Sequence, residues 1–137
     1  MIDKTPLDYH VIAERDHTIM NPMSPEKLDR LIDYCRIADG MGVLDIGCGK
    51  AWLLRRIAEK FAIQGVGIDT RDAFLDVARA AIKARALKGN LELITSPALS
   101  YADPRKFDVS LCIGAPFAIG TFVEAVDWLI ARTKPHG

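Results

Sequence analysis

The 137-residue sequence lacks the cysteine patterns of disulfide-rich and zinc-binding proteins. Cys35, Cys48 and Cys112 form neither an even set nor a Cys-x-x-Cys pair, so neither a disulfide framework nor a zinc site is expected. The three histidines have no cysteine or carboxylate partners at metal-ligand spacing. We therefore predict no metal site, and reduced thiols in a cytoplasmic protein.

An excess of one charge and long apolar runs are also missing. The 18 basic and 18 acidic residues give a formal net charge of zero, so no overall field favours nucleic acid or an anionic membrane. The N-terminus has no apolar core of a signal peptide, and no apolar run approaches the ~20 residues that span a bilayer. We predict no nucleic-acid or membrane partner, and one domain over residues 1–137 because the length suits a single core.

The most informative stretch is a predicted strand that turns sharply into a helix. Residues 43–46 form an apolar run of strand type, and Gly47 and Gly49 follow it directly. Apolar side chains at helical spacing occupy residues 51–61. A helix N-terminus carries unpaired N–H groups and the positive end of a dipole, so a glycine turn placed there lets a small ligand lie against the backbone.

Strands and helices alternate along the rest of the chain. The predicted strands are residues 43–46, 64–69, 91–95 and 107–114. The predicted helices are residues 6–16, 25–38, 51–61, 70–89 and 121–133, with Thr5, Ser24 and Thr121 as N-terminal caps. This order predicts an α/β fold in three layers, a doubly wound parallel sheet of about four strands with helices on both faces.

The carboxyl ends of parallel strands meet at one edge of the sheet, where ligands bind. Asp69 lies 20 residues beyond Gly49, at the end of the next predicted strand. A carboxylate there accepts hydrogen bonds from two ribose hydroxyls, or else caps the following helix. Asp45 is either a ligand-binding residue or a carboxylate that braces the turn by accepting its N–H groups.

Two common nucleotide classes do not fit this turn. Trp52 stands where the dinucleotide fingerprint Gly-x-Gly-x-x-Gly has its third glycine, and an indole leaves little room for a pyrophosphate, so NAD and FAD are disfavoured. A P-loop needs Ser or Thr after Gly-Lys, but Ala51 follows Lys50, so ATP and GTP are disfavoured as well.

The remaining pattern resembles the class I S-adenosylmethionine-dependent methyltransferases from about Ser24 to the last residue. The similar motifs are Leu44–Gly49, Val66–Asp69, Phe107–Val109 and Lys134–Gly137, in the family's order. The resemblance implies a Rossmann-like fold, and because the family's sheet has seven strands, the chain corresponds to a truncated form that ends before the fifth. It also implies that the N-terminal helices, residues 5–38, cover the site as a lid.

The resemblance further implies S-adenosyl-L-methionine as the cofactor and a set of residues that bind it. Gly47, Cys48 and Gly49 would contact the methionine part, and Asp69 the ribose. The other implied cofactor-binding residues are Asp45, Thr70 beside the adenine, Pro97 and Ala98 near the adenine amine, and Ile113 and Gly114 at the mouth. Asn21, before Pro22, either binds the methionine moiety or is a plain turn residue.

The implied activity is methyl transfer to an unidentified small-molecule acceptor. Methyl transfer needs positioning more than a general base, so no catalytic residue is named. The alternative is a non-catalytic module that binds the cofactor or a partner protein without turnover. Because a chain that ends before the fifth strand leaves residues 109–113 as an apolar sheet edge, we also predict a homodimer through this edge or an exposed helix face.

Overall fold

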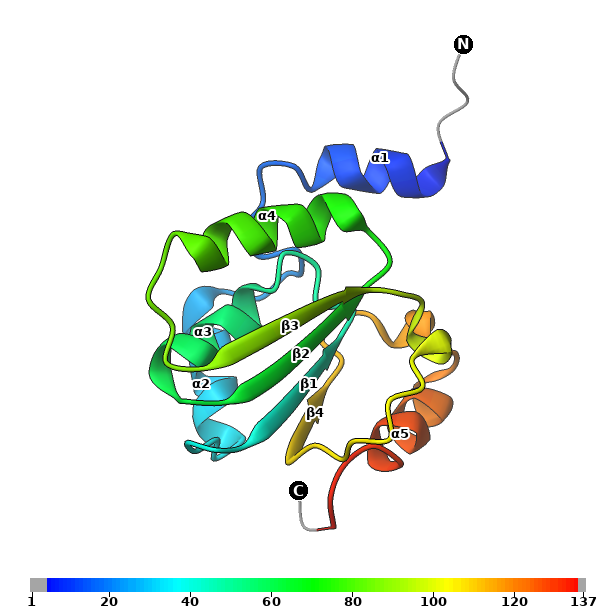
Figure 1. The fold of residues 1–137 in the computed structure, drawn as a ribbon. Helices are drawn as coiled ribbons and strands as arrows, with labels where there is room; N and C mark the ends of the chain where they lie inside the picture. Colours follow the sequence, from blue (N-terminus) through cyan, green and yellow to red (C-terminus); the bar gives the residue numbers. More distant parts are fainter. Residues whose placement is uncertain (1–4, 136–137) are drawn as a thin grey trace.

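A computed structural model describes residues 5–135 of the chain. Within these residues, four strands form one parallel sheet in the order β3-β2-β1-β4 (Figure 1). The strands are β1 (Gly42–Ile46), β2 (Gln64–Asp69), β3 (Asn90–Thr95) and β4 (Val109–Leu111). The predicted α/β parallel sheet of about four strands is confirmed. His136 and Gly137, which complete the last predicted motif, lie outside the described residues.

The chain winds outward from β1 through β2 to β3 and then returns to the opposite side of β1. β1 pairs with β2 over its whole length, from Gly42 beside Gln64 to Ile46 beside Ile68, and with β4 over three residue pairs. The winding therefore reverses between β1 and β4, which is the position where doubly wound sheets bind ligands.

Within the described residues, five α-helices and two short 3₁₀ helices connect and cover the strands. The α-helices are α1 (Pro6–Ala13), α2 (Pro25–Tyr34), α3 (Trp52–Lys60), α4 (Asp72–Lys83) and α5 (Phe122–Ile130), and the 3₁₀ helices are η1 (Ala98–Ser100) and η2 (Pro116–Ala118). The three predicted caps are confirmed, because the side chains of Thr5, Ser24 and Thr121 each accept a backbone N–H from the first turn of their helix.

Several predicted elements were too long. The fourth strand has only three residues, because the chain leaves the sheet towards Gly114, whose φ is +80°. α4 ends at Lys83 rather than near Gly89, since the backbone N–H groups of Lys88 and Gly89 donate to the carbonyl of Ala58 in α3 instead of continuing the helix. α1 ends at Ala13 and α5 at Ile130, each about three residues early.

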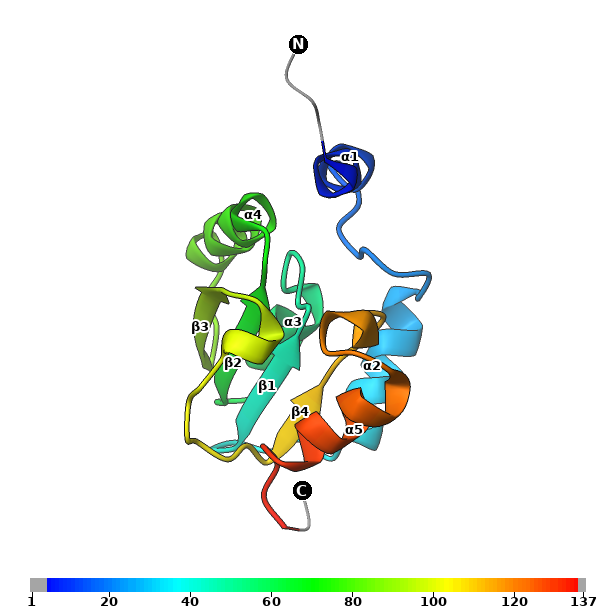
Figure 2. The ribbon, with the colours of Figure 1, turned by 90° about the vertical axis from the view of Figure 1, so that its right-hand side faces the viewer.

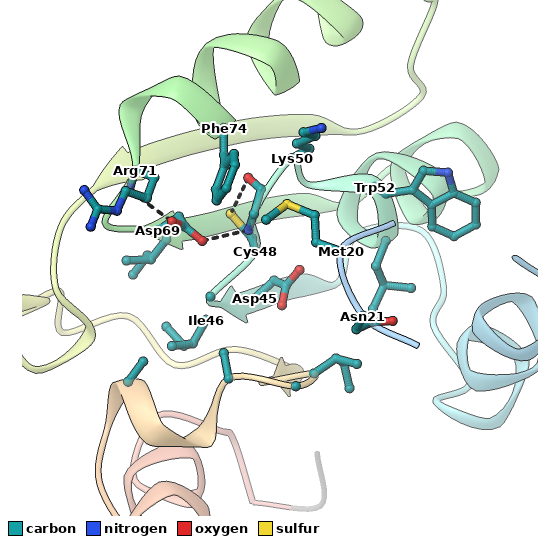
Figure 3. A pocket seen from close by; sticks show the side chains of 18 of the residues that line it. Met20, Asn21, Asp45, Ile46, Cys48, Lys50, Trp52, Asp69, Arg71 and Phe74 are labelled. Atoms are coloured by element: carbon teal, nitrogen blue, oxygen red, sulfur yellow. Dashed lines mark hydrogen bonds between the residues drawn. The ribbon is translucent and has the colours of Figure 1, made fainter. Parts of the chain in front are cut away.

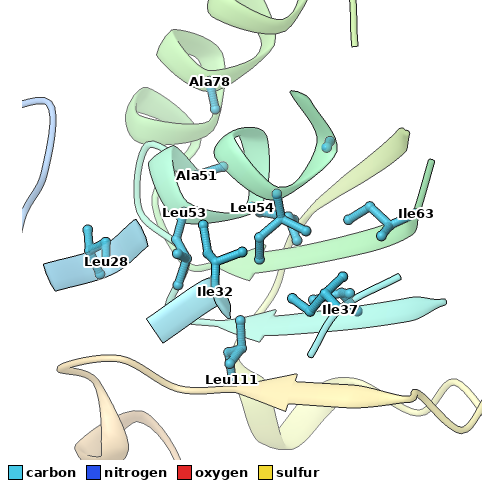
Figure 4. Packing of buried hydrophobic residues seen from close by; sticks show 12 residues of the cluster. Leu28, Ile32, Ile37, Ala51, Leu53, Leu54, Ile63, Ala78 and Leu111 are labelled. Atoms are coloured by element: carbon cyan, nitrogen blue, oxygen red, sulfur yellow. The ribbon is translucent and has the colours of Figure 1, made fainter. Parts of the chain in front are cut away.

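Two apolar clusters lie on opposite faces of the sheet and make the predicted three layers. One cluster joins α2, α3 and α4 to the sheet and includes Leu28, Ile32 and Leu54 (Figure 4). The other joins α5 and the 3₁₀ helices to the opposite face and includes Tyr101 and Ala125. α1 lies outside these layers, beyond α4 (Figures 1 and 2). No helix within residues 5–135 is long and apolar enough to cross a membrane.

The residues before β4 connect two of the predicted motifs. The Asp108 carboxylate accepts the backbone N–H of Gly42 at 2.7 Å and the Lys134 ammonium at 2.9 Å. Next to it, Phe107 forms a parallel bridge with Thr133. The backbone N–H of Gly42 and the Lys134 charge together lower the pKa of Asp108, so this carboxylate is ionised and ties the start of β1 to the segment after α5.

Candidate functional site

A cavity of about 370 Å³ opens at the carboxyl ends of all four strands, where the winding of the sheet reverses (Figure 3). Its walls come from the residues that follow β1, β2, β3 and β4, and from the segment between α1 and α2. The structure therefore confirms the prediction that the carboxyl ends of the four strands lie together at one cavity.

The glycine turn after β1 forms one wall of the cavity. Gly47 and Gly49 have φ angles of +68° and +54°, which favour glycine. A Cβ atom at Gly47 would also lie 2.4 Å from the Cβ of Ala115, so no larger residue fits there without a shift of the loop after β4. Ala51, two residues after Gly49, also has a positive φ, of +53°, and carries backbone strain that a glycine there would relieve.

The protein itself uses the N–H groups of this turn. Gly47 and Cys48 both donate to the Ile68 carbonyl, at 2.8 and 3.0 Å, and Gly49 donates to the Asp69 carboxylate. α3 begins after them with no side-chain cap, so the first N–H groups of α3 are left for a ligand or water.

Asp69 holds the turn and still faces the cavity. One carboxylate oxygen accepts the Gly49 N–H at 2.8 Å, and the other accepts the Arg71 N–H at 3.0 Å (Figure 3). Asp69 does not cap α4, whose N-cap is Arg71. Because an ionised carboxylate has about four acceptor positions, both oxygens keep capacity for further donors from the cavity.

Asp45 lies deeper in the same cavity and is only 4% exposed. The predicted bracing role is wrong for Asp45: among the described residues no group donates a hydrogen bond to its carboxylate, and Asp69 and the Ile68 carbonyl take the N–H groups of the turn instead. Burial, and secondarily the charge of Asp69, raise the pKa of Asp45 to about 7. Within residues 5–135, Asp45 is therefore a buried acceptor without a donor.

The segment between α1 and α2 crosses the cavity. The sulfur of Met20 lies 2.8 Å from the position that a Cβ atom would take at Gly49, and Asn21 lies next to Gly114. The Asn21 Oδ1 atom is buried and has no hydrogen-bond partner among the described residues. Asn21 and Asp45 therefore both bring unused acceptors to the cavity wall.

All the predicted cofactor-binding residues except Pro97 line this cavity. Pro97 is the N-cap of η1 and is exposed, whereas Ser96 before it and Ala98 after it line the cavity. The residues brought together are Asn21, Asp45, Gly47, Cys48, Gly49, Asp69, Thr70, Ala98, Ile113 and Gly114.

Sequence reasoning did not assign several other lining residues to the site. Met20, Lys50 and Arg71 each adjoin a predicted residue, and that adjacency is the one signal that could have found them. Phe74, in the first turn of α4, is 3% exposed and forms part of the wall. Burial raises the pKa of the Cys48 thiol well above its usual value, so this thiol stays neutral and is a poor nucleophile.

Comparisons with known proteins agree with this geometry. Residues 43–137 match the family described as methyltransferase domain. The structure of a SAM-dependent methyltransferase from Thiobacillus denitrificans, in complex with S-adenosyl-L-homocysteine, is similar with a TM-score of 0.89 and 32% identity, over 99% of this chain and 54% of that chain.

Two curated proteins are similar at the sequence level. Protein YjhP of Escherichia coli (strain K12) is 32% identical over 126 residues, which cover 92% of this chain and 51% of YjhP. A ubiquinone biosynthesis O-methyltransferase of Azoarcus sp. (strain BH72) is 32% identical over 94 residues, which cover 69% of this chain and 40% of that enzyme. The chain thus spans about half the length, or less, of these relatives.

Proposed function

Because the chain belongs to the methyltransferase domain family, we propose that its cavity binds S-adenosyl-L-methionine for methyl transfer to a small-molecule acceptor. The observation that carries the proposal is the convergence of the glycine turn and Asp69 at the point where the sheet reverses its winding. The family match favours methyl transfer over a non-catalytic binding module.

The polar groups of the cavity suit this cofactor. Asp45, Asp69 and the Asn21 Oδ1 atom all present acceptors, and two of these three groups have no donor within the described chain. S-Adenosylmethionine carries an ammonium group, a sulfonium charge and two ribose hydroxyls, which are donors or cations that such a wall attracts. A phosphate-bearing ligand would instead meet two carboxylates.

We assign the parts of the cofactor to the wall as follows. Asp69 accepts the ribose hydroxyls through its remaining lone pairs, and the glycine turn contacts the methionine part. Asp45 and Asn21 face the ammonium group. Thr70 and Ala98 lie beside the adenine, and Ile113 and Gly114 lie at the mouth; Pro97 is left out because it is exposed.

The bound cofactor supplies an activated methyl group, and the residues of this chain supply orientation. Ile113, Ala115 and Phe117 line the cavity on the side of β4, and none of them has a titratable side chain. We propose that this apolar side excludes water and positions the acceptor. No residue is assigned as a general base.

The remaining proposals concern assembly and location. The exposed face of α5 carries Phe122, Val123 and Ile130, which are 74%, 66% and 64% exposed, and apolar faces of this kind support a homodimer. Within one domain, α1 and the segment between α1 and α2 act as the lid; α2, which belongs to the predicted lid of residues 5–38, packs in the core instead. We keep a cytoplasmic location, which three free cysteines support, and no nucleic-acid partner, since the net charge is zero.

Calorimetric titration with S-adenosyl-L-homocysteine tests the proposed site. We expect one molecule to bind per chain, and Asp69→Ala to lower the affinity by about 1.5–3 kcal/mol, the contribution of hydrogen bonds to a charged acceptor. Asp76→Ala is the matched control, because Asp76 lies on α4 and pairs with Arg79 outside the cavity. An affinity within twofold of wild type for Asp69→Ala would remove Asp69 from the site.

A further inference from the structure

Lys50 follows the glycine turn but directs its ammonium group away from the ligand space. The residue is 6% exposed, and Nζ donates to the backbone carbonyls of Glu14, Arg15 and His17 at 2.6, 2.8 and 2.5 Å. An ammonium group has three N–H donors. All three are therefore taken by the N-terminal segment, and none is left for a ligand.

The acceptors of Lys50 lie at the carboxyl end of α1. This helix ends at Ala13 with Glu14 as its C-cap. The Glu14 carbonyl also accepts the His17 N–H, whereas the carbonyls of Arg15 and His17 have no backbone donor among the described residues. They also form the negative end of the helix dipole, where a cation is favourable. A buried ammonium needs such partners because leaving water is costly. The position of Lys50 and the position of this segment therefore depend on each other.

The segment that Lys50 holds is the one that covers the cavity. Met20 lies on Gly49, and Asn21 lies beside Gly114, on the opposite wall. Among the described residues, segment 14–21 makes no other hydrogen bond to the chain beyond residue 24. Apart from apolar packing, Lys50 alone attaches this segment to the glycine turn.

We propose that Lys50 is a positioning residue that anchors segment 14–21 over the cavity, so that a cofactor enters and leaves only when the Lys50 hydrogen bonds open. The part of this proposal that concerns the cofactor rests on the proposed function. The anchor itself is a property of the free protein. Ala51 after Lys50 already disfavours a P-loop, and the three carbonyl contacts leave the Lys50 ammonium no donor for a phosphate.

Two measurements on Lys50→Met test separately whether Lys50 anchors segment 14–21 and whether this anchor controls the entry and exit of the cofactor. The methionine keeps an unbranched stem but removes all three donors. Within this segment the hydrogen-bonded amides are those of Glu14, Arg15 and His17. In the free protein we expect their hydrogen exchange to be at least about tenfold faster, because each lost bond to a charged group contributes about 1.5 kcal/mol or more, and 1.4 kcal/mol corresponds to a factor of ten. Exchange in β1, β2 and β3 stays as in wild type.

The second measurement is the dissociation rate of S-adenosyl-L-homocysteine in stopped flow. We expect dissociation from Lys50→Met to be about tenfold faster or more, with the same one-to-one stoichiometry. Lys88→Met is the matched control, because Lys88 also donates to a backbone carbonyl, that of Lys60 at 3.1 Å, but it is exposed and distant from the cavity. It should change neither rate.

Lys50→Arg distinguishes the contribution of the positive charge from the contribution of side-chain packing. Arginine restores a cation near the same carbonyls, so we expect protection intermediate between wild type and Lys50→Met, and this variant also serves if Lys50→Met does not fold. Unchanged hydrogen exchange at Glu14, Arg15 and His17 would overturn the proposal that Lys50 anchors this segment. Faster amide hydrogen exchange with an unchanged dissociation rate would overturn the proposal that the Lys50 hydrogen bonds control cofactor exit. Failure of wild type to bind the ligand would overturn the proposed function but leave the exchange result valid.

Discussion

Replacing Asp45 by asparagine should change how the stability of the protein depends on pH. Asp45 is buried at the bottom of the cavity, receives no hydrogen bond within the described chain, and lies in the field of Asp69. Burial and this second charge raise its pKa to about 7. Asp45→Asn keeps the shape of the side chain but removes the ionisation.

The magnitude follows from the difference between the two pKa values. The ordinary aspartate pKa of 3.8 applies to the unfolded chain, whereas the pKa of Asp45 in the folded chain is about 7. At 1.36 kcal/mol per unit, ionisation of Asp45 destabilises the native state by about 4 kcal/mol at most. The folded chain binds the Asp45 proton more tightly than the unfolded chain does. The stabilisation that this tighter binding gives the native state is therefore fully present below pH 4 and is lost as the pH rises to about 7.

Urea unfolding of wild type and Asp45→Asn between pH 4 and 8 measures the effect. We expect the unfolding free energies of the two proteins to differ little near pH 4. As the pH rises, the unfolding free energy of Asp45→Asn should exceed that of wild type by a growing amount, up to about 4 kcal/mol at pH 8. Taking the difference cancels the carboxylates with lowered pKa values, such as Asp29 and Asp108, which both proteins share. A difference that is constant with pH would refute the reasoning.

Two further predictions concern the glycine turn and the surface. Gly47→Ala should lower the free energy of unfolding by more than Gly40→Ala does. Both positions have positive φ, which costs an alanine about 1–2 kcal/mol, but only at Gly47 would the new Cβ also meet Ala115. Equal losses of unfolding free energy in urea would contradict the close contact. Light scattering at micromolar concentration should give a dimer that Ile130→Glu converts to a monomer, and a wild-type monomer would rule out the proposed assembly.

Much of the fold could be predicted because its signals are local. The apolar run of β1, the two glycines after it and the capping residues Thr5, Ser24 and Thr121 act within a few residues of their place in the chain. The ends of α4 and β4 could not be predicted in the same way. α4 stops because Lys88 and Gly89 bond to α3, which is a tertiary contact with no sequence signature.

In the candidate site, too, the features with local signals could be predicted, and those that depend on tertiary contacts could not. Strand ends in a parallel sheet meet at one edge, so the residues after β1, β2 and β4 could be placed together from the sequence. Which of two carboxylates braces the turn depends on the exact offset of neighbouring strands, and Asp69 rather than Asp45 proved to have that role. Lys50 bonds to carbonyls 33 to 36 residues earlier, and no pattern in the sequence predicts such a contact.

The most direct test is a crystal structure of the chain grown with saturating S-adenosyl-L-homocysteine. We expect the ligand in the cavity at the strand ends, with its ribose hydroxyls on Asp69 and its ammonium group near Asp45 and Asn21. An empty cavity at saturation, or a ligand bound elsewhere on the chain, would contradict the proposed site.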